Sequence, residues 1–437
     1  MSGKPIGVGM IGLGTVGGGV AQLLQDQAET YAKRIGRPVV LQRVLVRDAK
    51  RPDRQNGPWA ELVTDDVDSF FATPDMDIVV EVAGGVDVAG TFVRRAIESG
   101  RHVVTANKSL LAADGPALFA LARSKGVAIA FEASCAGGIP VVTALKFGLM
   151  ANRIDALCGI LNGTCNYILT AMSRDGQAYA DALANAQRLG YAEADPTLDV
   201  TGQDAAQKLV ILASLAFGER VTIDQVHCEG IDGVDIVDIQ SGKELGYEVK
   251  LLAIAERVDG ALSLRVHPAM VPVEAQLAQV QDAYNALSVY GHATGHTMYF
   301  GRGAGQMPTA GAVVSDVLNV ASGWYPHAVA QMQLLPDCYE SAASADPDGV
   351  MSRFYLRISG KDEPGVLARI AAIVGSHGIS ISAVLQHEVE PGNFVPVFIT
   401  THLARQGAMN AARREIEALD SVDGAAVVMR VFDPPEA

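Results

Sequence analysis

A glycine-rich turn near the N-terminus places the strongest constraint on the fold of this 437-residue chain. Residues 5–12 (PIGVGMIG) form an apolar run typical of a buried strand, and a helical pattern follows through about Lys33. Gly12, Gly14 and Gly17 stand between the two in G-x-G-x-x-G spacing. The first glycine permits a tight turn, the second lets backbone approach a pyrophosphate, and the third lets helix and strand pack closely. We therefore predict that this turn binds a dinucleotide at the helix N-terminus.

Apolar runs alternate with helical patterns over the first 140 residues. The runs cover 39–46, 77–84, 102–106 and 127–133, and helical stretches include 87–99 and 109–125. Strands that alternate with helices pair in parallel and carry helices on both faces of the sheet. We predict an α/β fold here, with a Rossmann-like, doubly wound NAD(P)-binding domain over residues 1–139. A glycine loop and helix at about 301–325 are expected to complete it.

The pattern changes after residue 140. Helical stretches at 140–150, 164–175, 178–189 and 203–217 are mixed with a strand at 154–161. The segment LLAIAERVDGALSLRVHP predicts a hairpin that turns at Asp259-Gly260. We expect residues 140–300 to form a second, α+β domain built on a mixed or antiparallel sheet.

A small, polar segment at 340–351 (ESAASADPDGVM) is predicted to be a linker. Beyond it, the pattern is strand 353–358, helix 365–377, strands 379–388 and 394–402, helix 406–419 and strand 425–432. This βαββαβ order predicts a ferredoxin-like domain over residues 352–437.

Composition excludes several classes of function. A formal net charge of −15 disfavours nucleic acid or an anionic membrane as a partner. The longest apolar runs are about nine residues, well short of the roughly 20 that span a bilayer. The five cysteines are odd in number and form no CxxC pair. They are Cys135, Cys158, Cys165, Cys228 and Cys338. This usage is typical of the reducing cytoplasm, where we expect the protein, rather than of disulfides or a zinc site.

Two segments after strands are expected to contact the cofactor. Arg47 and Asp48 end the second strand and are followed by Lys50 and Arg51. An acid there accepts the ribose hydroxyls of NAD, whereas arginine pairs with the 2′-phosphate of NADP, so either cofactor fits and the basic residues slightly favour NADP. A solvated loop is the alternative.

The segment TANK (105–108) ends another strand of the predicted sheet. Ligands in such sheets bind beyond the carboxyl ends of the strands. Asn107 and Lys108 are therefore expected near the nicotinamide. The alternative is that Lys108 is an ordinary surface lysine.

A cluster of acids precedes a lysine in YAEADPTLDVTGQDAAQK (191–208). Asp204 and Lys208 are four apart and share a helix face. The following LVILASLAF is apolar nearly all round, as in a buried helix. A lysine without water pairs with a carboxylate or loses its proton, which suits it to proton transfer. The alternative is an exposed ion pair that contributes only about 0.3–0.5 kcal/mol.

Glu193, Asp195 and Asp199 in the same segment suggest either a divalent metal or an ammonium group as ligand. Oxygen ligands suit magnesium or calcium. However, the spacing of a calcium loop is absent, and Lys208 would oppose a dication. We favour a substrate whose amino group the acids bind while the lysine serves one of its oxygens. Asp195 is followed by Pro196 and has no clear role beyond a turn.

Six segments, in order across about 320 residues, resemble homoserine dehydrogenase. They are GLGTVGGG (12–19), TANK (105–108), EASCAGGIP (132–140), GILNGTCNYIL (159–169), GYAEADPTLDVTGQDAAQK (190–208) and GAGQMPTAGAVVSD (303–316). The tail resembles an ACT domain through DEPGVLARIAAIVGSHGISI (362–381). The combination is specific and typical of the bacterial monofunctional enzyme. Gly311 stands where the family often has serine.

The resemblance implies NAD(P)-dependent interconversion of L-aspartate 4-semialdehyde and L-homoserine, on the route to threonine and methionine. It implies that Lys208 transfers the proton with Asp204 beside it, and that Lys108 contacts substrate and cofactor. Glu193 and Asp199 would hold the amino group, and NGT (162–164), including Thr164, would line the substrate pocket. Residues 140–300 would form the substrate-binding, catalytic and dimerisation domain. The implied cofactor contacts are Gly12, Leu13, Gly14, Thr15, Val16, Gly17, Arg47, Gly84, Thr105, Lys108 and Gly305.

The resemblance also implies three further partners. A monovalent cation, Na⁺ or K⁺, would bind mainly backbone carbonyls at Glu132, Cys135, Gly137 and Ile139. Threonine would inhibit through the turn from Asp362 to Gly365, since a helix N-terminus there can take a carboxylate. Paired ACT domains imply a homodimer or homotetramer. A tail used only for dimerisation is the alternative.

Two rival functions belong to other classes. In an acylating aldehyde dehydrogenase, Cys135 or Cys165 would be the nucleophile, but a free buried cysteine is usually inert and no histidine is evident to activate it. A non-enzymatic amino-acid sensor would use the ACT-like tail, but it has no need for Asp204 and Lys208.

Overall fold

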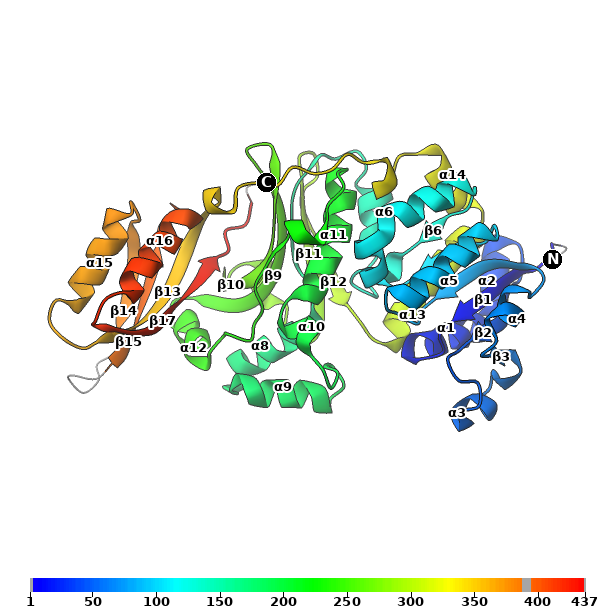
Figure 1. Cartoon of the computed structure of the whole chain (residues 1–437), viewed down its shortest axis with the longest axis horizontal. Helices are drawn as coiled ribbons and strands as arrows, with labels where there is room; N and C mark the ends of the chain where they lie inside the picture. The colour runs from blue at the N-terminus through cyan, green and yellow to red at the C-terminus, as the bar shows by residue number, and fades with distance from the viewer. Residues whose placement is uncertain (1–2, 387–393, 436–437) are drawn as a thin grey trace. The chain divides into compact units, whose positions relative to one another are not determined.

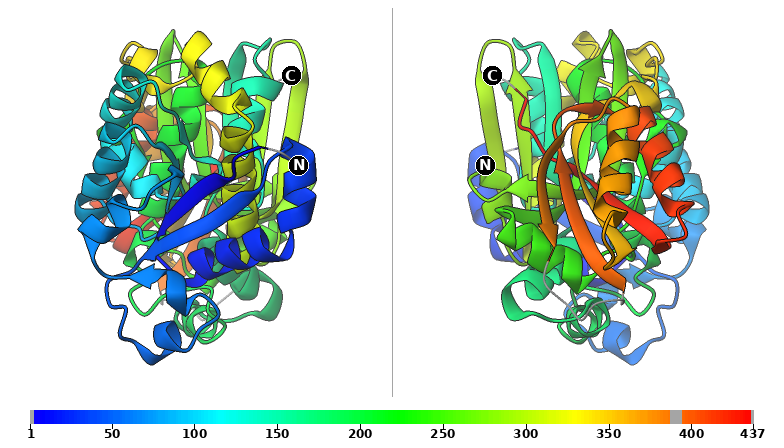
Figure 2. Two further views of the ribbon diagram at one scale, coloured as in Figure 1. Left: turned by 90° about the vertical axis from the view of Figure 1, so that its right-hand side faces the viewer. Right: turned by 90° about the vertical axis from the view of Figure 1, so that its left-hand side faces the viewer.

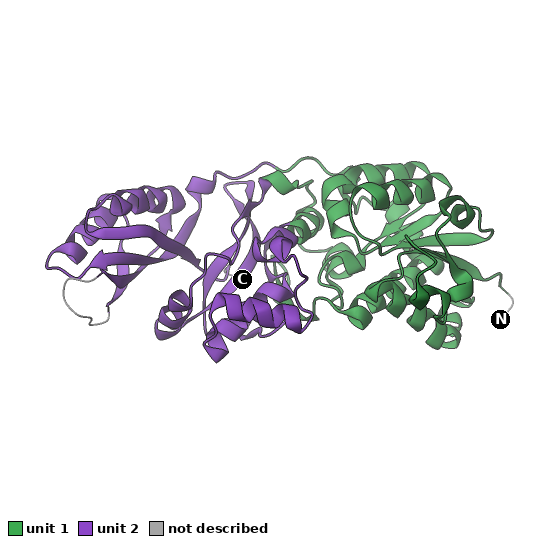
Figure 3. Ribbon diagram, turned by 60° about the horizontal axis from the view of Figure 1, so that its bottom comes forward, with its two compact units in different colours: residues 1–154, 207–224, 285–342 green, residues 155–206, 225–284, 343–437 purple. Residues whose placement is uncertain are grey.

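The computed structural model describes residues 3–386 and 394–435, and the chain divides into two compact units (Figure 3). Unit 1 comprises residues 1–154, 207–224 and 285–342, and unit 2 comprises 155–206, 225–284 and 343–437. The division falls inside helix α11 (Gln203–Phe217). The three-part division at 140, 300 and 352 stays a prediction.

The first strands of unit 1 form a parallel sheet in the order β3-β2-β1-β4-β5-β6. Their bounds are β1 (Ile6–Ile11), β2 (Val39–Leu45), β3 (Val63–Thr64), β4 (Met76–Glu81), β5 (His102–Thr105) and β6 (Ile129–Ala130). Central β1 pairs with β2 on one side and β4 on the other. This is the order of doubly wound dinucleotide-binding sheets, whose ligand crevice lies where the winding reverses beside β1. The predicted α/β fold is confirmed.

Helices cover both faces of this sheet, so β1 is buried at every position. Helices α1 (Thr15–Asp26) and α13 (Gln306–Ala321) cover one face, and α5 (Asp87–Glu98) and α6 (Lys108–Ser124) cover the other (Figures 1 and 2). A Cβ on Gly19 of α1 would lie 2.9 Å from that of Ala310 in α13, so this glycine lets the two helices approach closely. The late helix therefore belongs to unit 1, as expected for 301–325.

Some local predictions differ from the structure. The helix expected through Lys33 breaks at Gln27 into α1 and α2 (Ala28–Ile35). The strand expected at 127–133 keeps only two residues, and two-residue β3 was missed because it is too short to show a period. The helix expected at 140–150 begins as α7 (Val141–Thr143) and continues as a π-helical turn through Gly148.

The sheet of unit 2 runs in the order β7-β9-β10-β17-β13-β15-β14. Strands β9 (Tyr247–Val258) and β10 (Ala261–Pro272) form a long antiparallel hairpin, and β7 (Ile154–Ile160) pairs with β9. The turn residues Asp259 and Gly260 have φ of 51° and 87°, as a two-residue type I′ turn requires. The predicted hairpin is confirmed. Further elements of unit 2 are α8 (Gly163–Asp175), α9 (Tyr179–Arg188), α10 (Thr197–Val200), β8 (His227–Cys228) and α12 (Ile236–Glu244).

The C-terminal part of unit 2 has the predicted βαββαβ order. Its elements are β13 (Met351–Lys361), α15 (Val366–Ser376), β14 (Ile381–Gln386), β15 (Phe394–Thr401), α16 (Gln406–Glu417) and β17 (Val422–Val431), with short β16 (Ala404–Arg405) before α16. Both helices lie on one face of its antiparallel sheet (Figures 1 and 2). Fully buried Phe354, Leu356 and Ile370 form part of the core between them. The last two residues of the strand expected at 379–388 lie outside the described residues.

This C-terminal domain is docked on the rest of unit 2 rather than only tethered to it. Strand β17 pairs in parallel with β10 through Ala269 and Arg430. Asp238 of α12 is fully buried and accepts hydrogen bonds from Tyr355 Oη (3.0 Å) and Arg357 Nε (2.7 Å) of β13. Unpairing such a buried carboxylate is costly, so these contacts hold the domain in place.

The remaining strands, β11 (Tyr284–Gly291) and β12 (Gly295–Arg302), are neighbours and lead into α13. All five cysteines are free thiols. Within the described ranges, no helix has the length and apolar content to cross a membrane.

Candidate active site

The glycine turn has the geometry expected of a phosphate site. Gly12 has φ of +99°, and a Cβ there would lie 2.9 Å from the nitrogen of Ala83. A Cβ on Gly17 would lie 2.3 Å from the carbonyl oxygen of Gly12, so α1 starts closer to the turn than any other residue allows. Gly14 is the N-cap of α1 and has open space on its Cβ side. Backbone N–H groups at the start of α1 are therefore accessible, which suits a pyrophosphate.

A buried carboxylate that sequence reasoning missed organises the loops after β4 and β5. Glu81 is fully buried, and its Oε1 accepts the N–H groups of Ala83 and Gly84, each at 2.9 Å. Its Oε2 accepts the hydroxyl of Thr105 at 2.7 Å. Two of the expected cofactor residues, Gly84 and Thr105, are thus fixed by one anion. The available signal was a lone glutamate inside the apolar run IVVEVAG.

Asn107 extends this network to the start of α6. Its Oδ1 accepts the N–H of Leu110, which caps the helix, and its Nδ2 donates to the carbonyl of Gly85 at 2.6 Å. Its own N–H donates to Thr105 Oγ1 at 3.0 Å. Lys108, the first residue of α6, is therefore held at the carboxyl edge of the sheet, where cofactors bind in such folds.

Unit 1 brings Lys108 and Lys208 to the same region. Ser109 Oγ donates to Gln207 Oε1 at 2.9 Å, which holds the start of α6 beside α11 next to both lysines. The charges of both lysines act on the thiol of Cys135 and lower its pKa, although burial raises it more. Helix α11 is buried from 209 to 215, but Lys208 is partly exposed. The expectation that this lysine lies out of reach of water is wrong, because the first turns of α11 reach the surface on one side.

Neither candidate cysteine is placed as a nucleophile. Cys135 is fully buried, and burial raises the pKa of its thiol to about 12, so it carries no thiolate at neutral pH. Cys165 is also fully buried, and its Sγ donates to the carbonyl of Asp199 at 3.1 Å. These placements count against the acylating mechanism.

In unit 2, Asn162 joins two of the expected acids. Its Nδ2 donates to Asp199 Oδ1 at 2.7 Å and to Asp204 Oδ2 at 2.8 Å. Its Oδ1 accepts the N–H of Cys165, which caps α8. Asn162 is 3% exposed and Asp204 is 7% exposed. The amide therefore fixes Asp199 of α10 and Asp204 at the start of α11, and Asp204 stands four residues before Lys208 on the same helix face.

The loop before α10 carries the other acids. Thr164 Oγ1 donates to the carbonyl of Tyr191 at 2.7 Å and ties this loop to α8. Glu193 is exposed on the loop, and Asp199 is partly buried. Asp195 accepts both the hydroxyl (2.6 Å) and the N–H (3.1 Å) of Thr197, which holds the pKa of Asp195 below its usual range. Asp195 therefore forms a turn. Among the described residues, no three His, Cys, Asp or Glu side chains form a metal cluster.

The segment 132–139 is compatible with a cation bound by backbone. The carboxylate of Glu132 accepts the N–H groups of Val142 (2.9 Å) and Thr143 (2.7 Å), and its main-chain carbonyl accepts the N–H of Cys135 at 3.4 Å. No described group donates a hydrogen bond to the carbonyls of buried Cys135 and Gly137. Unpaired buried carbonyls suit a monovalent cation.

A buried charged cluster next to residues 132–139 was not predicted from the sequence. Asp316 of α13 accepts the N–H of Glu132 at 2.7 Å, and Lys146 Nζ donates to Tyr325 Oη at 2.9 Å. Burial raises the pKa of Asp316 and lowers that of Lys146, while each charge stabilises the other. The cluster links α13 to the segment that carries the expected cation ligands.

Other expected contacts lie on turns. Arg47 is exposed and has no ion pair within the described part of the chain, while Asp48 accepts the N–H of Lys50 at 2.8 Å. Gly305, with φ of +125°, is the N-cap of α13. Gly365, with φ of +93°, is the N-cap of α15, and Asp362 accepts Gln386 Nε2 at 3.3 Å.

Three family models match the chain in order. The NAD-binding domain of homoserine dehydrogenase matches residues 12–132, homoserine dehydrogenase matches 140–318, and the ACT domain matches 354–420. The homoserine dehydrogenase of Pseudomonas aeruginosa is 44% identical over 432 residues, covering 98% of this chain and 99% of that protein.

Solved structures show the same similarity. A homoserine dehydrogenase from Thiobacillus denitrificans has a TM-score of 0.92 and 43% identity, covering 98% of this chain and 99% of its own. A hyperthermophilic archaeal homoserine dehydrogenase in complex with NADPH has a TM-score of 0.62 and 24% identity, covering 72% of this chain and 97% of its own. At that identity the second structure shows the fold alone.

Proposed function

The chain belongs to the homoserine dehydrogenase family of NAD(P)-dependent oxidoreductases acting on CH–OH groups, and we propose that it interconverts L-aspartate 4-semialdehyde and L-homoserine on the route to threonine and methionine. The observation that carries this proposal is the amide of Asn162, which holds Asp199 and Asp204; Asp204 stands four residues before Lys208 in α11. Paired acids beside a lysine suit a substrate with an ammonium group and a reacting oxygen.

A bound nicotinamide would supply hydride transfer at the carbon that bears the reacting oxygen. As negative charge develops on that oxygen, Lys208 donates a proton to it, an effect typically of about 10²–10⁴ in rate. Lys108 stabilises the developing alkoxide, and Asp199 with Glu193 binds the ammonium group. Asp204 positions Lys208. In the reverse reaction Lys208 must accept a proton, so homoserine oxidation speeds up as pH rises.

The test measures NADPH consumption with aspartate semialdehyde. We expect Lys208→Met to lower kcat about 10²–10⁴-fold without changing the affinity for NADPH. The control Lys125→Met, at the exposed end of α6, is expected to leave kcat unchanged. A Lys208→Met enzyme within tenfold of wild type would refute the assignment. So would a homoserine oxidation rate that is flat from about pH 6 to about pH 10 while chemistry limits.

We infer a modest preference for NADP. Arg47 supports it, because this residue has no ion pair within the described part of the chain. The nearby carboxylate of Asp48 already accepts the backbone N–H of Lys50. Arg47→Gln is expected to raise KM for NADPH about tenfold and leave KM for NADH unchanged, because only NADPH carries the 2′-phosphate. Arg54→Gln is the control, since Arg54 pairs with Asp53. Equal changes for both cofactors would contradict the inference.

We further propose that Na⁺ or K⁺ binds the carbonyls of Glu132, Cys135, Gly137 and Ile139. Either chloride salt, compared with choline chloride at equal ionic strength, is expected to raise both the melting temperature and kcat. If choline matches both salts on the melting temperature, the segment binds no cation.

Threonine inhibition through Asp362 and Gly365 is proposed from the helix N-terminus at α15. Calorimetry and initial rates with excess threonine test it on the wild type, with Asp362→Ala as the variant and Asp420→Ala as an exposed control. Unchanged rates together with no heat of binding would rule it out. The cytoplasmic location and a homodimer or homotetramer stay predictions, the latter measurable by light scattering.

A further inference from the structure

Glu81 is a buried carboxylate that has no cation beside it. It is the last residue of β4 and is fully buried. Its Oε1 accepts the N–H groups of Ala83 and Gly84, and its Oε2 accepts the hydroxyl of Thr105. Because all three partners donate and none accepts, the group is an ionised carboxylate. Within the described ranges Glu81 forms no ion pair, so neutral groups satisfy its hydrogen bonds and no positive charge cancels its own.

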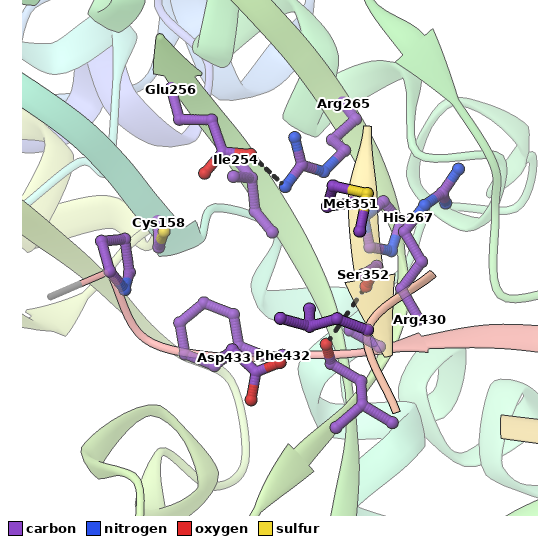
Figure 4. Close-up of a pocket in the computed structure, with 14 residues that line it drawn as sticks. Cys158, Ile254, Glu256, Arg265, His267, Met351, Ser352, Arg430, Phe432 and Asp433 are labelled. Carbon is purple, nitrogen blue, oxygen red and sulfur yellow. Dashed lines mark hydrogen bonds and ion pairs between the residues drawn. The ribbon is translucent and has the colours of Figure 1, made fainter. Parts of the chain in front are cut away.

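Two other carboxylates of the chain show the usual arrangement, in which a cation is paired with the acid. Glu256 Oε1 lies 2.6 Å from Nη2 of Arg265 (Figure 4). Asp238 likewise accepts Nε of Arg357 at 2.7 Å. Beyond such a pair, the fields of the two opposite charges largely cancel. The field of Glu81 is not cancelled in this way, and water screens a buried charge only weakly.

The position of Glu81 in the sheet places this charge at the cofactor site. Glu81 pairs in register with Ile11, the last residue of β1, and with Thr105, the last residue of β5. The glycine turn begins at the next residue after β1, Gly12. A dinucleotide on such a sheet lays its pyrophosphate over this turn and its two halves to either side. The adenine half is expected beyond β2, where Arg47 stands, so the nicotinamide half belongs beyond β4 and β5.

The oxidised and reduced forms of the nicotinamide ring differ in charge. The oxidised ring carries one positive charge, and the reduced ring carries none. A fixed negative charge near the ring therefore stabilises the oxidised form and leaves the reduced form nearly unaffected. Lys108 is expected near the same ring, but it is partly exposed, so water screens its charge more than that of Glu81.

We propose that the charge of Glu81 raises the affinity of the site for the oxidised cofactor relative to the reduced cofactor. Glu81 does so through its electric field, since a fully buried side chain does not touch the cofactor. The reduction potential of the bound couple is lowered, which favours hydride transfer from the cofactor to the substrate. This preference depends on dinucleotide binding at the glycine turn and not on the substrate proposed above.

A purely structural role is the alternative, because the same carboxylate orders the loop after β4. Loss of loop order weakens the binding of both cofactor forms alike, whereas loss of the charge changes the ratio of their affinities. Two substitutions separate these effects. Glu81→Gln removes the charge, and its amide oxygen can still accept the N–H groups of Ala83 and Gly84. Glu81→Asp keeps the charge but is one methylene shorter, so it loses those contacts.

Titration calorimetry with NADP⁺ and with NADPH, at fixed pH and ionic strength, gives the two dissociation constants. No substrate is present, so the result does not depend on the proposed reaction. In Glu81→Gln the ratio of the Kd for NADP⁺ to the Kd for NADPH is expected to rise about tenfold, because one attraction between unit charges is lost. A tenfold rise raises the potential of the bound two-electron couple by about 30 mV.

The other variants serve as comparisons. Glu81→Asp is expected to raise both dissociation constants and to leave their ratio unchanged. Glu98→Gln is the control and is expected to change neither constant, because Glu98 is exposed at the last position of α5. An unchanged ratio in Glu81→Gln would overturn the proposal. So would an equal change of the ratio in Glu81→Gln and Glu81→Asp.

A second measurement needs only the wild-type protein. The benzamide analogue of NADP⁺ has a carbon atom in place of the charged ring nitrogen and keeps the planar ring. It is expected to bind about tenfold more weakly than NADP⁺, because the attraction to Glu81 is absent. Equal affinities for the two compounds contradict the proposal, so this comparison decides the matter even if Glu81→Gln does not fold.

Discussion

Replacing Asn162 with aspartate changes one amide to a carboxylate of the same shape and tests the central contact of the site. The cap of α8 survives, because a carboxylate oxygen still accepts the N–H of Cys165. The two hydrogen bonds to Asp199 and Asp204 are lost, because the new group has no hydrogen to donate. Three carboxylates then meet at a place where Asn162 is only 3% exposed.

The size of the effect follows from these contacts. A hydrogen bond to a charged group contributes about 1.5–3 kcal/mol, so two such bonds amount to about 3–6 kcal/mol. Uptake of a proton by one of the three carboxyl groups relieves part of the repulsion. We expect the free energy of unfolding to fall by about 2–4 kcal/mol. If about 3 kcal/mol of the loss falls on the placement of Asp204 and Lys208, kcat/KM drops about 10²-fold, at 1.36 kcal/mol for each factor of ten.

Urea unfolding and NADPH-dependent reduction of aspartate semialdehyde measure the two effects. Asn185→Asp is the control, because that amide donates to the neutral Gln177 at 2.8 Å. In the double variant Asn162→Asp with Asp204→Asn, the amide at 204 can donate to the carboxylate at 162. This variant is therefore expected to recover stability but not activity. A kcat/KM for Asn162→Asp within threefold of wild type, or full activity in the double variant, would refute the reasoning.

Further predictions concern the thiol, the domain contact and the buried histidine. Cys135→Ser is expected to keep kcat within a few fold, because its pKa of about 12 leaves no thiolate to lose; steady-state rates check this. Arg357→Leu leaves the buried carboxylate of Asp238 without its cation and is expected to cost about 3 kcal/mol in urea unfolding, whereas Tyr355→Phe costs about 1 kcal/mol. The pKa of His267 is well below 6.5, so only the unfolded chain takes up this proton as pH falls. Stability is therefore lost below about pH 6.5 at up to about 1.4 kcal/mol per pH unit, and urea midpoints at about pH 7 and pH 5 should show that His267→Phe removes this part of the slope.

Features that depend on neighbours along the chain were predictable from the sequence. The glycine spacing at Gly12 and Gly17, the alternation of strands with helices, and the turn at Asp259-Gly260 each express a local geometric requirement, and the structure has all three. The same holds for the βαββαβ order of the tail. A strand as short as β3 was not predictable, because two residues show no periodicity. The break of the first helix at Gln27 was not predictable either.

Burial and side-chain contacts were not predictable from the sequence in this way. The sequence predicted a lysine on an apolar helix but placed Lys208 out of reach of water, because the composition of α11 does not tell which side reaches the surface. It named Asp204 and Asp199 but not the role of Asn162, 42 residues from Asp204, because that bond exists only once α8 and α11 are packed.

The sequence by itself determined the kind of fold, and it supplied the dinucleotide-binding turn and the residues that we propose transfer a proton, since all of these rest on local spacing and residue chemistry. Only the tertiary structure decided how those residues are held. The bond from Glu81 to Thr105 spans 24 positions, and the bond from Glu132 to Asp316 spans 184. The pairing of β10 with β17 likewise joins segments that are far apart along the chain. Such contacts form when distant segments exclude water together, and no pattern along the chain records which polar groups then meet.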